Sequence, residues 1–533
     1  MAYYRDIREQ LETLEEKGLL TRITREINKD TELQALVALQ YRGLCEEQRK
    51  AFLFENVTDS RGRKYGTPVA LSALAGTRDI YAVGLKCQPD ELAAKWDYAI
   101  SHPIKPVMVE SGAVYEEIHT GNGLLKHGGL DEFPIPNATP GFDPAPFFSA
   151  HCVVSKDPET GIRNVGTYRS HVKSPSRTSM FLHHQEQHLG ISWSKCRKLG
   201  IPLQAAIFIG GPPCITYTSV SKLGYDDDEF DVAGGLAGEP ILLTRCKTVD
   251  LEVPAFAEIV IEGEISVKET EPEGPFGEFQ GYMGPRENCM PFFDVKCIAH
   301  RKNPVLLAIG SRFPPSENTK IVEIAREAAI YKVLNDINIQ GIKAVAVLES
   351  AGACAYVVIQ MEKPQRGEVM RALETASHTL TLNKVCVAVD TDIDPWDAVA
   401  VNWAISYRSD PQRDAKIIYY PAPGTDFSIE PIPDTMARDA SFKGAPQASR
   451  LLIDATLKWP YPPLSLPKKE FMERAIEIWE QENLPKLNLQ EPWWGYSLGY
   501  WTDEEDTQAK LAVEGRYYES GETLAKRRSK LEE

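Results

Sequence analysis

The stretch EPEGPFGEFQGYMG, residues 271 to 284, places carboxylates among aromatic residues. On an extended chain Glu273 and Glu278 would stand roughly 17 Å apart, at about 3.4 Å per residue. The GPFG sequence between them favours a turn, which would fold both acids towards one pocket. Aromatic neighbours would desolvate a carboxylate and raise its pKa, which would make it a general acid near neutral pH. The alternative is an acidic loop in solvent.

A second candidate is RNVGTYRSH, residues 163 to 171. Asn164 and Arg169 are five positions apart, an odd spacing, so on one strand they would face opposite sides unless a bulge or turn intervenes. Arginine suits a planar, bidentate grip on a carboxylate, and asparagine offers a neutral oxygen to a hard metal ion. The alternative is a structural arginine beside a surface asparagine.

Histidines gather in MFLHHQEQH, residues 180 to 188. His184 and His188 would share one face of a helix, and His183 adjoins His184. Together with a nearby carboxylate they could bind a metal, although the order is not the HExxH of a zinc protease. The alternative is that these histidines are packed or solvated.

The acidic run YDDDEF, residues 225 to 230, is most simply a solvated loop. Its Glu229, however, borders an apolar, glycine-rich helical pattern, FDVAGGLAG. A carboxylate at that boundary could complete an oxygen-and-nitrogen site for manganese, iron or magnesium. The sequence shows no Walker A loop, no GxGxxG after a strand and no GxSxG elbow.

Composition narrows the class of protein. The chain has 533 residues and a formal net charge of −17, which argues against a nucleic-acid partner. No apolar run reaches the length of a membrane span, and the N-terminal amphipathic pattern lacks an apolar signal core. The ten cysteines include no CxxC pair, which is typical of reduced thiols. We therefore expect a cytoplasmic protein without a membrane span.

The hydrophobic pattern divides the chain into successive parts. Residues 1–125 alternate helical and strand patterns and predict a small α/β domain. Residues 126–325 are mainly strand-like, with a helical insertion, and begin with a proline-rich linker or wrap at 131–148. Residues 326–460 again alternate and favour a parallel or mixed sheet covered by helices. Residues 461–533 predict a helical and aromatic tail that contacts another surface, such as a neighbouring subunit.

Taken together, these stretches resemble the UbiD-type decarboxylases, which use a prenylated flavin. The resemblance runs through most of the chain and is weakest beyond about residue 490. Its motifs occur in the family's order and spacing: YRDIREQLETLEEKGLLTRI, LFENV, GTRDIYAVGL, NVGTYR, IGGPP, DLEVPAFAEIVIEG, EGPFGEFQGY, VDTDIDPWDAVAVNWAISYRSDPQRD and IDATLKWP.

The resemblance implies an N-terminal α/β domain, a central split β-barrel like that of flavin reductases, and a C-terminal α/β domain. It implies prenylated FMN (a prenylated flavin mononucleotide), held through a divalent metal, commonly manganese with iron or magnesium as alternatives, and a potassium ion nearby. It also implies a flavin prenyltransferase as the supplier of the cofactor and a homo-oligomer, either a dimer or a hexamer.

The resemblance also assigns roles to single residues. The catalytic triad would consist of Glu273, Arg169 and Glu278, with Glu278 as the proton donor. The metal ligands would be Asn164, His184 and Glu229, with His183 or His188 as alternatives to His184. The potassium loop would contain Thr218, Ser219 and Ser221. The cofactor would contact Asn164, Thr167, Tyr168, Arg169, Ser219 and Arg450, where Arg450 stands in place of a lysine of the relatives.

The leading hypothesis is a reversible, non-oxidative decarboxylase of an aromatic, heteroaromatic or α,β-unsaturated acid. The substrate would be a free acid or an aryl-coenzyme A thioester such as phthaloyl-CoA. Losing carbon dioxide from an sp² carbon needs an electron sink, which the flavin would supply. The alternatives are a flavin-dependent oxidoreductase built on the split barrel and a flavin-carrying scaffold without turnover.

Overall fold

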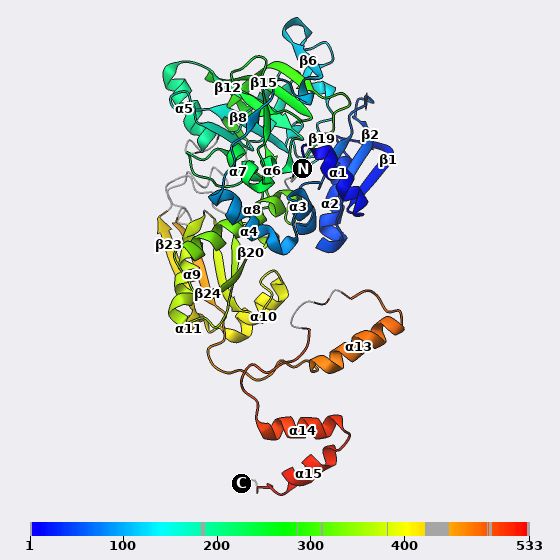
Figure 1. The fold of residues 1–533 in the computed structure, drawn as a ribbon, viewed down its shortest axis with the longest axis vertical. Coiled ribbons are helices and arrows are strands. Elements are labelled where there is room, and N and C mark those ends of the chain that lie inside the picture. The colour runs from blue at the N-terminus through cyan, green and yellow to red at the C-terminus, as the bar shows by residue number, and fades with distance from the viewer. Residues whose placement is uncertain are drawn as a thin grey trace.

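A computed structural model shows three sheet-containing parts packed into one body and a C-terminal arm that extends away from it (Figure 1). Among the residues described, no helix combines the length and the apolar composition that a membrane span requires. The structure describes residues 3–182, 187–284, 286–310, 313–380, 382–421, 447–487, 489 and 493–529.

The N-terminal part is a small sheet flanked by helices, as the sequence predicts. Its strand order is β1-β2-β4-β19, with β3 paired to β2. The first helix begins after Asp6, whose side chain accepts a hydrogen bond from the backbone N–H of Glu9 and so caps the helix. The elements are β1 (Leu20–Asn28), β2 (Ala51–Thr58), β3 (Lys64–Tyr65), β4 (Val69–Leu71), α1 (Ile7–Glu16), α2 (Leu33–Gly43), α3 (Arg78–Gly84) and α4 (Leu92–Ser101).

One strand of this sheet comes from much later in the chain. Residues 304–310, PVLLAIG, lie in the stretch predicted to be mainly strand-like, and their strand β19 (Leu306–Leu307) pairs in parallel with β4. The hydrophobic pattern identifies this strand but not its partner. The chain therefore returns to the N-terminal sheet before it enters the C-terminal part.

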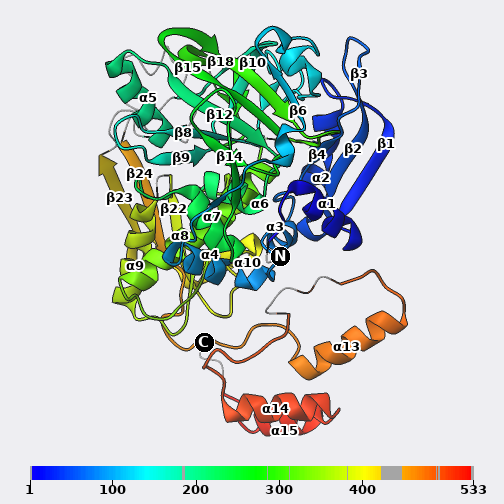
Figure 2. The ribbon, with the colours of Figure 1, turned by 45° about the horizontal axis from the view of Figure 1, so that its top comes forward.

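The central part is a nine-stranded sheet of order β7-β10-β11-β18-β15-β12-β8-β9, with β6 paired to β18. The sheet curls into a half-barrel (Figure 2). Its elements are β6 (Glu117–Thr120), β7 (Phe147–Phe148), β8 (His151–Lys156), β9 (Arg163–Gly166), β10 (Ser170–Ser174), β11 (Arg177–Ser179), β12 (Leu203–Ile209), β15 (Ile259–Glu273) and β18 (Glu287–His300).

Helices and smaller sheets surround the half-barrel. The helical insertion predicted from Phe181 to Leu199 begins later among the described residues, at His188. The surrounding elements are α5 (His188–Leu199), α6 (Pro213–Ser219), α7 (Glu229–Ala237), β5 (Val107–Met108), β13 (Leu242–Arg245), β14 (Glu252–Pro254), β16 (Phe276–Gly277) and β17 (Met283–Gly284).

The long hairpin of β15 and β18 sets the two ends of this sheet. Its register runs from Ile259 opposite His300 at one end to Glu273 opposite Glu287 at the other. Since a strand rises about 3.3 Å per residue, these ends lie about 40 Å apart along β18. The acid Glu273 is thus fixed at one end of the half-barrel.

The C-terminal part is a mixed sheet of order β20-β21-β22-β24-β23, covered by helices on both faces. Along β21, Val357 packs in the core that contains α8 and α9, and Val358 packs in the core that contains α10. This alternation is that of a strand buried on both sides. The elements are β20 (Ile342–Val347), β21 (Tyr356–Met361), β22 (Val385–Asp390), β23 (Ala415–Pro421), β24 (Gln447–Asp454), α8 (Glu317–Asp336), α9 (Arg366–Thr379), α10 (Ala398–Arg408) and α11 (Pro411–Asp414).

Helix α8 joins the C-terminal part to the rest of the body. Ile321 and Ile324 near its start belong to the core shared with the N-terminal and central parts. Ile330 and Leu334 near its end belong to the core of the C-terminal sheet. Because one rigid helix contributes to both cores, it couples the position of the C-terminal sheet to that of the half-barrel.

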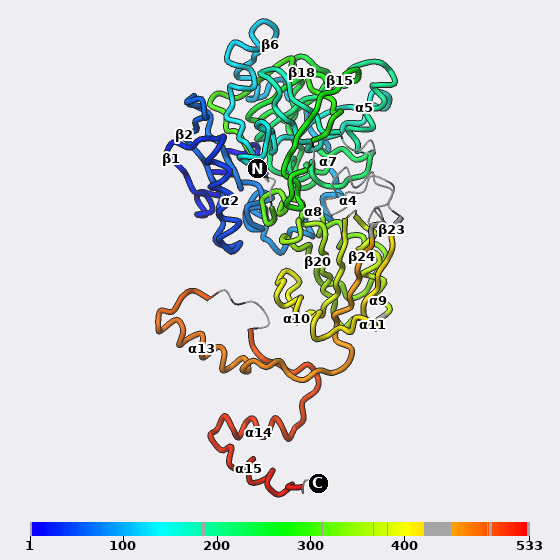
Figure 3. The backbone as a smooth tube through the Cα atoms, turned by 180° about the vertical axis from the view of Figure 1, so that it is seen from behind, coloured from blue at the N-terminus to red at the C-terminus, as the bar shows by residue number. Residues whose placement is uncertain are grey.

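The tail forms an arm, which we define as residues 461–529. It contains α13 (Lys469–Gln481), α14 (Asp503–Val513) and α15 (Tyr517–Ala525), and none of these three helices has a buried residue within this chain. The arm lies apart from the body in both front and rear views (Figures 1 and 3). Exposed aromatic residues along it include Tyr500 and Trp501.

Candidate active site

Arg169 binds two glutamates of the acidic loop. Its Nε donates to Glu273 Oε1 at 3.0 Å, and its Nη2 donates to Glu273 Oε2 at 2.7 Å. Its Nη1 donates to Glu278 Oε1. The exposed fractions of the side chains are 0% for Glu273, 11% for Arg169 and 24% for Glu278. The loop predicted from sequence is therefore no solvated acidic loop, since one of its acids is fully buried against a cation.

The chain leaves the strand conformation between Asn164 and Arg169. Strand β9 ends at Gly166 and β10 begins at Ser170, so residues 167–169 form an irregular link and the two side chains do not lie on one continuous strand. Gly166 has no space for a side chain, because a Cβ there would lie 2.5 Å from the ring of Tyr168. The ring of Tyr168 therefore packs directly over the backbone of Gly166.

The acidic loop itself is held by backbone hydrogen bonds. Glu273 ends β15, and β16 pairs with β17 a few residues later. Within this small hairpin the N–H of Glu278 donates to the carbonyl of Tyr282 at 2.8 Å, and the N–H of Gly281 donates to the carbonyl of Glu278 at 2.9 Å. Gly281 has φ of +91°, a conformation that favours glycine. The turn predicted at GPFG is therefore misplaced: Phe276–Gly277 form β16 and the turn follows Glu278, although both acids do reach Arg169.

Aromatic rings pack mainly on the guanidinium group. Arg169 lies 3.8 Å from the ring centroid of Phe181 and 5.2 Å from that of Phe276. Phe276 in turn packs on Phe147, with centroids 4.6 Å apart, whereas Tyr282 is 58% exposed. The rings shield one side of the guanidinium group from water and stabilise it by cation–π contacts. Glu278 contacts this guanidinium group. It remains a prediction that burial among aromatic rings keeps Glu278 protonated.

The predicted metal ligands lie beside this triad. Glu229 is the first residue of α7, is 4% exposed and accepts a hydrogen bond from the N–H of Val165 at 2.8 Å. Val165 follows Asn164 on β9, so the strand brings the two candidate ligands close together. Nδ1 of His188 lies 3.9 Å from Glu229 Oε1. His183 and His184 lie outside the described residues, so His184 as a ligand stays a prediction.

These residues fit a divalent cation. Burial raises the pKa of Glu229 to about 8, so the site favours the neutral acid unless a cation compensates the charge of the carboxylate. Carboxylate and amide oxygens with an imidazole nitrogen form a donor set suited to manganese or iron. Of the histidines considered from sequence, His188 lies within the described residues, and its Nδ1 is near Glu229.

Four of the predicted cofactor contacts, Asn164, Thr167, Tyr168 and Ser219, contact one another around the link at 167–169. Thr167 Oγ1 lies 2.9 Å from Ser219 Oγ, and the N–H of Thr167 donates to the carbonyl of Ser219 at 3.2 Å. Asn164 Nδ2 donates to Tyr168 Oη at 3.5 Å. Burial raises the pKa of Tyr168 to about 12, so the phenol is neutral at physiological pH.

The proposed potassium loop lies at the end of α6. The hydroxyl of Thr218 donates to the carbonyl of Ile215 at 2.9 Å, and that of Ser221 donates to the carbonyl of Tyr217 at 2.9 Å. Both hydroxyls therefore use their hydrogens within the chain and keep oxygen lone pairs for a cation.

Arg450 belongs to a different part of the molecule. It lies on β24, opposite Ile418 of β23, and is 7% exposed. Its contact with the cofactor stays a prediction. The sequence analysis missed Phe181, whose ring covers Arg169, because a phenylalanine beside a histidine pair carries no signal of that role.

Three family models match successive stretches of the chain. They are the N-terminal domain of 3-octaprenyl-4-hydroxybenzoate carboxy-lyase at residues 11–100, its Rift-related domain at 109–312 and its C-terminal domain at 319–455. All three models describe domains of one enzyme family, known as UbiD.

Curated proteins and solved structures point to the same enzymes. A phenolic acid decarboxylase of Bacillus subtilis is 30% identical over 469 residues, which cover 85% of this chain and 92% of that protein. An evolved dimeric form of HmfF, a UbiD-class enzyme of Pelotomaculum thermopropionicum solved in complex with prFMN, is 31% identical, with a TM-score of 0.74. The match covers 87% of this chain and 97% of that one. The vanillic acid decarboxylase of Sedimentibacter hydroxybenzoicus in open form is 26% identical, with a TM-score of 0.73 and coverage of 90% of this chain and 100% of that one.

Proposed function

The chain belongs to the UbiD family of carboxy-lyases, and on that premise we propose that it is a reversible, non-oxidative decarboxylase that uses prenylated FMN. Its substrate would be an aromatic, heteroaromatic or α,β-unsaturated carboxylic acid. Support comes from the prFMN complex of the similar HmfF and from the phenolic acid decarboxylases among the relatives. The phenolic acid decarboxylases among the relatives favour a carboxy-lyase over the alternative of a flavin-dependent oxidoreductase.

The observation that carries the proposal is the arrangement of Arg169 between two acids. The bidentate contact with buried Glu273 fixes the plane of the guanidinium group. That plane directs Nη1 to Glu278, the more exposed of the two acids and so the one a substrate can reach. We assign proton delivery to a carboxyl oxygen of Glu278, orientation to Arg169, and fixation of Arg169 to Glu273.

The chain's own residues also suggest how the cofactor is held. When bound, prenylated FMN would supply the electron sink that loss of carbon dioxide from an sp² carbon requires and that side chains lack. Asn164, Glu229 and a histidine, either His184 or His188, would hold the divalent metal, with manganese favoured over iron or magnesium. Thr218, Ser219 and Ser221 would hold potassium. Further contacts to the cofactor would come from Thr167, Tyr168, Arg169, Ser219 and Arg450.

The site also bears on how substrate binds. All three nitrogens of Arg169 donate to glutamates, so this arginine is occupied and does not serve as the main clamp for a substrate carboxylate. The rings of Phe181 and Phe276 flank it and favour a planar, apolar substrate. Both a free acid and an aryl-coenzyme A thioester such as phthaloyl-CoA meet this requirement.

We further propose that the protein acts as a homo-oligomer, either a dimer or a hexamer, and that a flavin prenyltransferase supplies its cofactor. The exposed apolar residues of the arm support the oligomer, because within the described residues its helices α13, α14 and α15 bury no side chain. The domain boundaries at residues 125, 325 and 460 stay predictions.

The test is to make the protein alongside a flavin prenyltransferase and to measure its absorbance spectrum and the mass of the released cofactor. Carbon dioxide release is then measured on a panel of aromatic and unsaturated acids that includes coenzyme A thioesters. We expect a prenylated flavin and turnover of one class of acid. A folded protein that binds no such flavin under any condition, or a loaded protein that releases no carbon dioxide, would overturn the proposal.

A further inference from the structure

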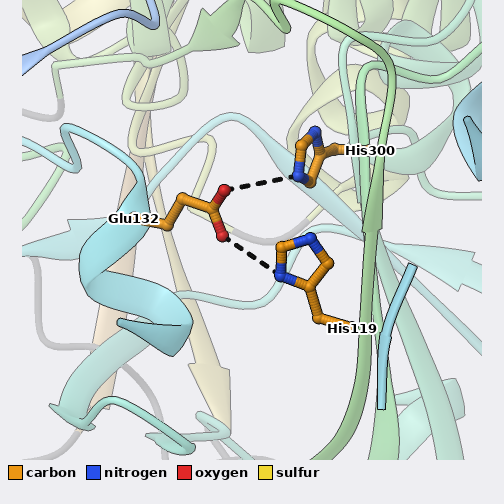
Figure 4. A group of neighbouring side chains, drawn as sticks. All are labelled: His119, Glu132 and His300. Atoms are coloured by element: carbon orange, nitrogen blue, oxygen red, sulfur yellow. Dashed lines mark ion pairs between the residues drawn. The ribbon is translucent and has the colours of Figure 1, made fainter. Parts of the chain in front are cut away.

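Two histidines and a glutamate converge at the end of the β15–β18 hairpin that lies opposite the Arg169 site. Nδ1 of His119 lies 3.5 Å from Oε2 of Glu132, and Nε2 of His300 lies 3.5 Å from Oε1 of the same residue (Figure 4). The three ligand atoms all lie within 4.8 Å of one another. We propose that His119, Glu132 and His300 form a second metal site, which binds a divalent transition ion of the zinc class.

The fold fixes these side chains on separate elements. His119 of β6 pairs with Ile298 of β18, and His300 follows two residues later, so both imidazoles leave the same face of the sheet. Glu132 ends a short 3₁₀ helix, η5 (Gly129–Glu132). That helix comes close to the backbone of Pro175, since a Cβ at Gly129 would lie 2.2 Å from its carbonyl oxygen. The carboxylate is thereby held over the two rings.

Three buried polar atoms at this point have no hydrogen-bond partner in the described part of the chain. They are Nδ1 of His119, Oε2 of Glu132 and Nε2 of His300. His119 is 8% exposed and His300 is 7% exposed, so water does not satisfy them freely. Buried polar atoms are nearly always hydrogen-bonded, and three unsatisfied atoms that face one another indicate a common partner.

The hydrogen bonds around His300 favour a metal as that partner. Its Nδ1 lies 2.8 Å from the carbonyl oxygen of Arg301, and a carbonyl can only accept, so Nδ1 carries the hydrogen. In the neutral ring Nε2 then presents a lone pair to the cluster. A ligating histidine usually donates its other ring N–H to a carbonyl or carboxylate in this way.

The distances suit a metal better than direct hydrogen bonds. Both contacts to Glu132 are 3.5 Å, which is longer than an ordinary N–H···O bond of about 2.7–3.2 Å. Two ligands about 2.0–2.1 Å from a tetrahedral zinc ion stand about 3.4 Å apart. Two imidazoles and a carboxylate are a zinc or iron donor set and a poor one for magnesium or calcium.

A fourth position is open to water or to His127, whose ring centroid lies 4.6 Å from that of His119. The site lies about 40 Å along β18 from Glu273, so the ion has no part in proton delivery. A bound ion would instead hold η5 against the sheet. The chain that follows η5 is buried at Phe133 and leads to Phe147, which packs on Phe276 beside Arg169.

The test is a zinc titration of the full-length protein after chelator treatment, without added flavin. We expect Glu132→Gln to remove one equivalent of bound zinc, or to weaken it at least tenfold, because the change removes the anionic ligand and keeps its shape. The matched control is Glu269→Gln, which alters an exposed acid on β15 away from the cluster and should bind as wild type does. Glu229→Gln should remove a different equivalent, which separates this site from the one proposed for the cofactor's metal.

A second measurement keeps the proposal testable if Glu132→Gln folds poorly. Crystals of the wild-type protein soaked in zinc should show anomalous density between His119, Glu132 and His300. The proposal is overturned if no density appears there, or if wild type binds no zinc beyond the equivalent lost in Glu229→Gln. Equal zinc affinity of Glu132→Gln and Glu269→Gln would also overturn it.

Discussion

The role assigned to Glu273 gives a quantitative prediction for Glu273→Gln. Glu273 is fully buried and accepts two hydrogen bonds from Arg169. The amide keeps one oxygen acceptor and turns an N–H₂ group towards the guanidinium, so one charge-assisted hydrogen bond is lost. Such a bond contributes about 1.5–3 kcal/mol. If Arg169 is held less firmly by that amount, kcat should fall by about 10- to 150-fold, at about 1.4 kcal/mol per tenfold.

The assay compares initial rates of carbon dioxide release at saturating substrate, with each enzyme corrected for its content of prenylated flavin. We expect the loss in kcat and little change in KM, because Glu273 acts through Arg169 and not on the substrate. The matched control is Glu271→Gln in the same loop, where the acid pairs with Arg177 at 3.1 Å and lies outside the triad. Full activity of Glu273→Gln at equal cofactor content would refute the assignment, as would an equal loss in Glu271→Gln.

Three further predictions concern the cofactor's metal, pH and assembly. Asn164→Ala and Glu229→Gln should each lose divalent metal and flavin together, as measured by elemental analysis and absorbance, and a fully loaded variant would contradict the ligand assignment. Burial lowers the pKa of His151 to about 4, and its Nε2 contacts the carbonyl of Tyr168 at 2.7 Å. Since the unfolded histidine titrates near 6.5, the unfolded state binds more protons between these values. The contribution of His151 to the free energy of unfolding should therefore be constant above about pH 6.5. It should fall by about 3 kcal/mol as the pH is lowered to 4. The free energy of unfolding of the flavin-free protein is measured in urea against pH, and His151→Asn should lack this loss. Identical pH profiles of wild type and His151→Asn would contradict the prediction. Deletion of residues 461–533 should reduce the oligomer mass in light scattering and leave the unfolding temperature of the body unchanged, because the helices of the arm bury no residue in their own chain. An unchanged mass would show that the arm makes no subunit contact.

Local features of the fold could be predicted from the sequence. The hydrophobic pattern predicted mainly strands in residues 126–325, where most of the nine-stranded sheet lies, and the odd spacing of Asn164 and Arg169 allowed for the break in the strand found at 167–169. Partnerships between strands could not be predicted, because a pattern of side chains does not name its neighbour. β19 shows this, since it joins the N-terminal sheet.

The two sites differ in how far the sequence reveals them. Glu273 and Glu278 stand close together in a distinctive motif, but their partner Arg169 lies 104 residues before Glu273 and is identified by family resemblance alone. His119, Glu132 and His300 form no motif, because strand pairing between β6 and β18 brings the histidines together. Such a site is visible only after the chain has folded.

The central claim is that Glu278 delivers the proton in a flavin-dependent decarboxylation. The most direct test is deuterium incorporation in heavy water, measured by mass spectrometry on the product of wild type and of Glu278→Gln, both loaded with prenylated flavin. We predict that wild type releases carbon dioxide and places one deuterium on the carbon that bore the carboxylate, and that Glu278→Gln retains its cofactor but loses this exchange. Exchange at the wild-type rate in loaded Glu278→Gln would contradict the claim.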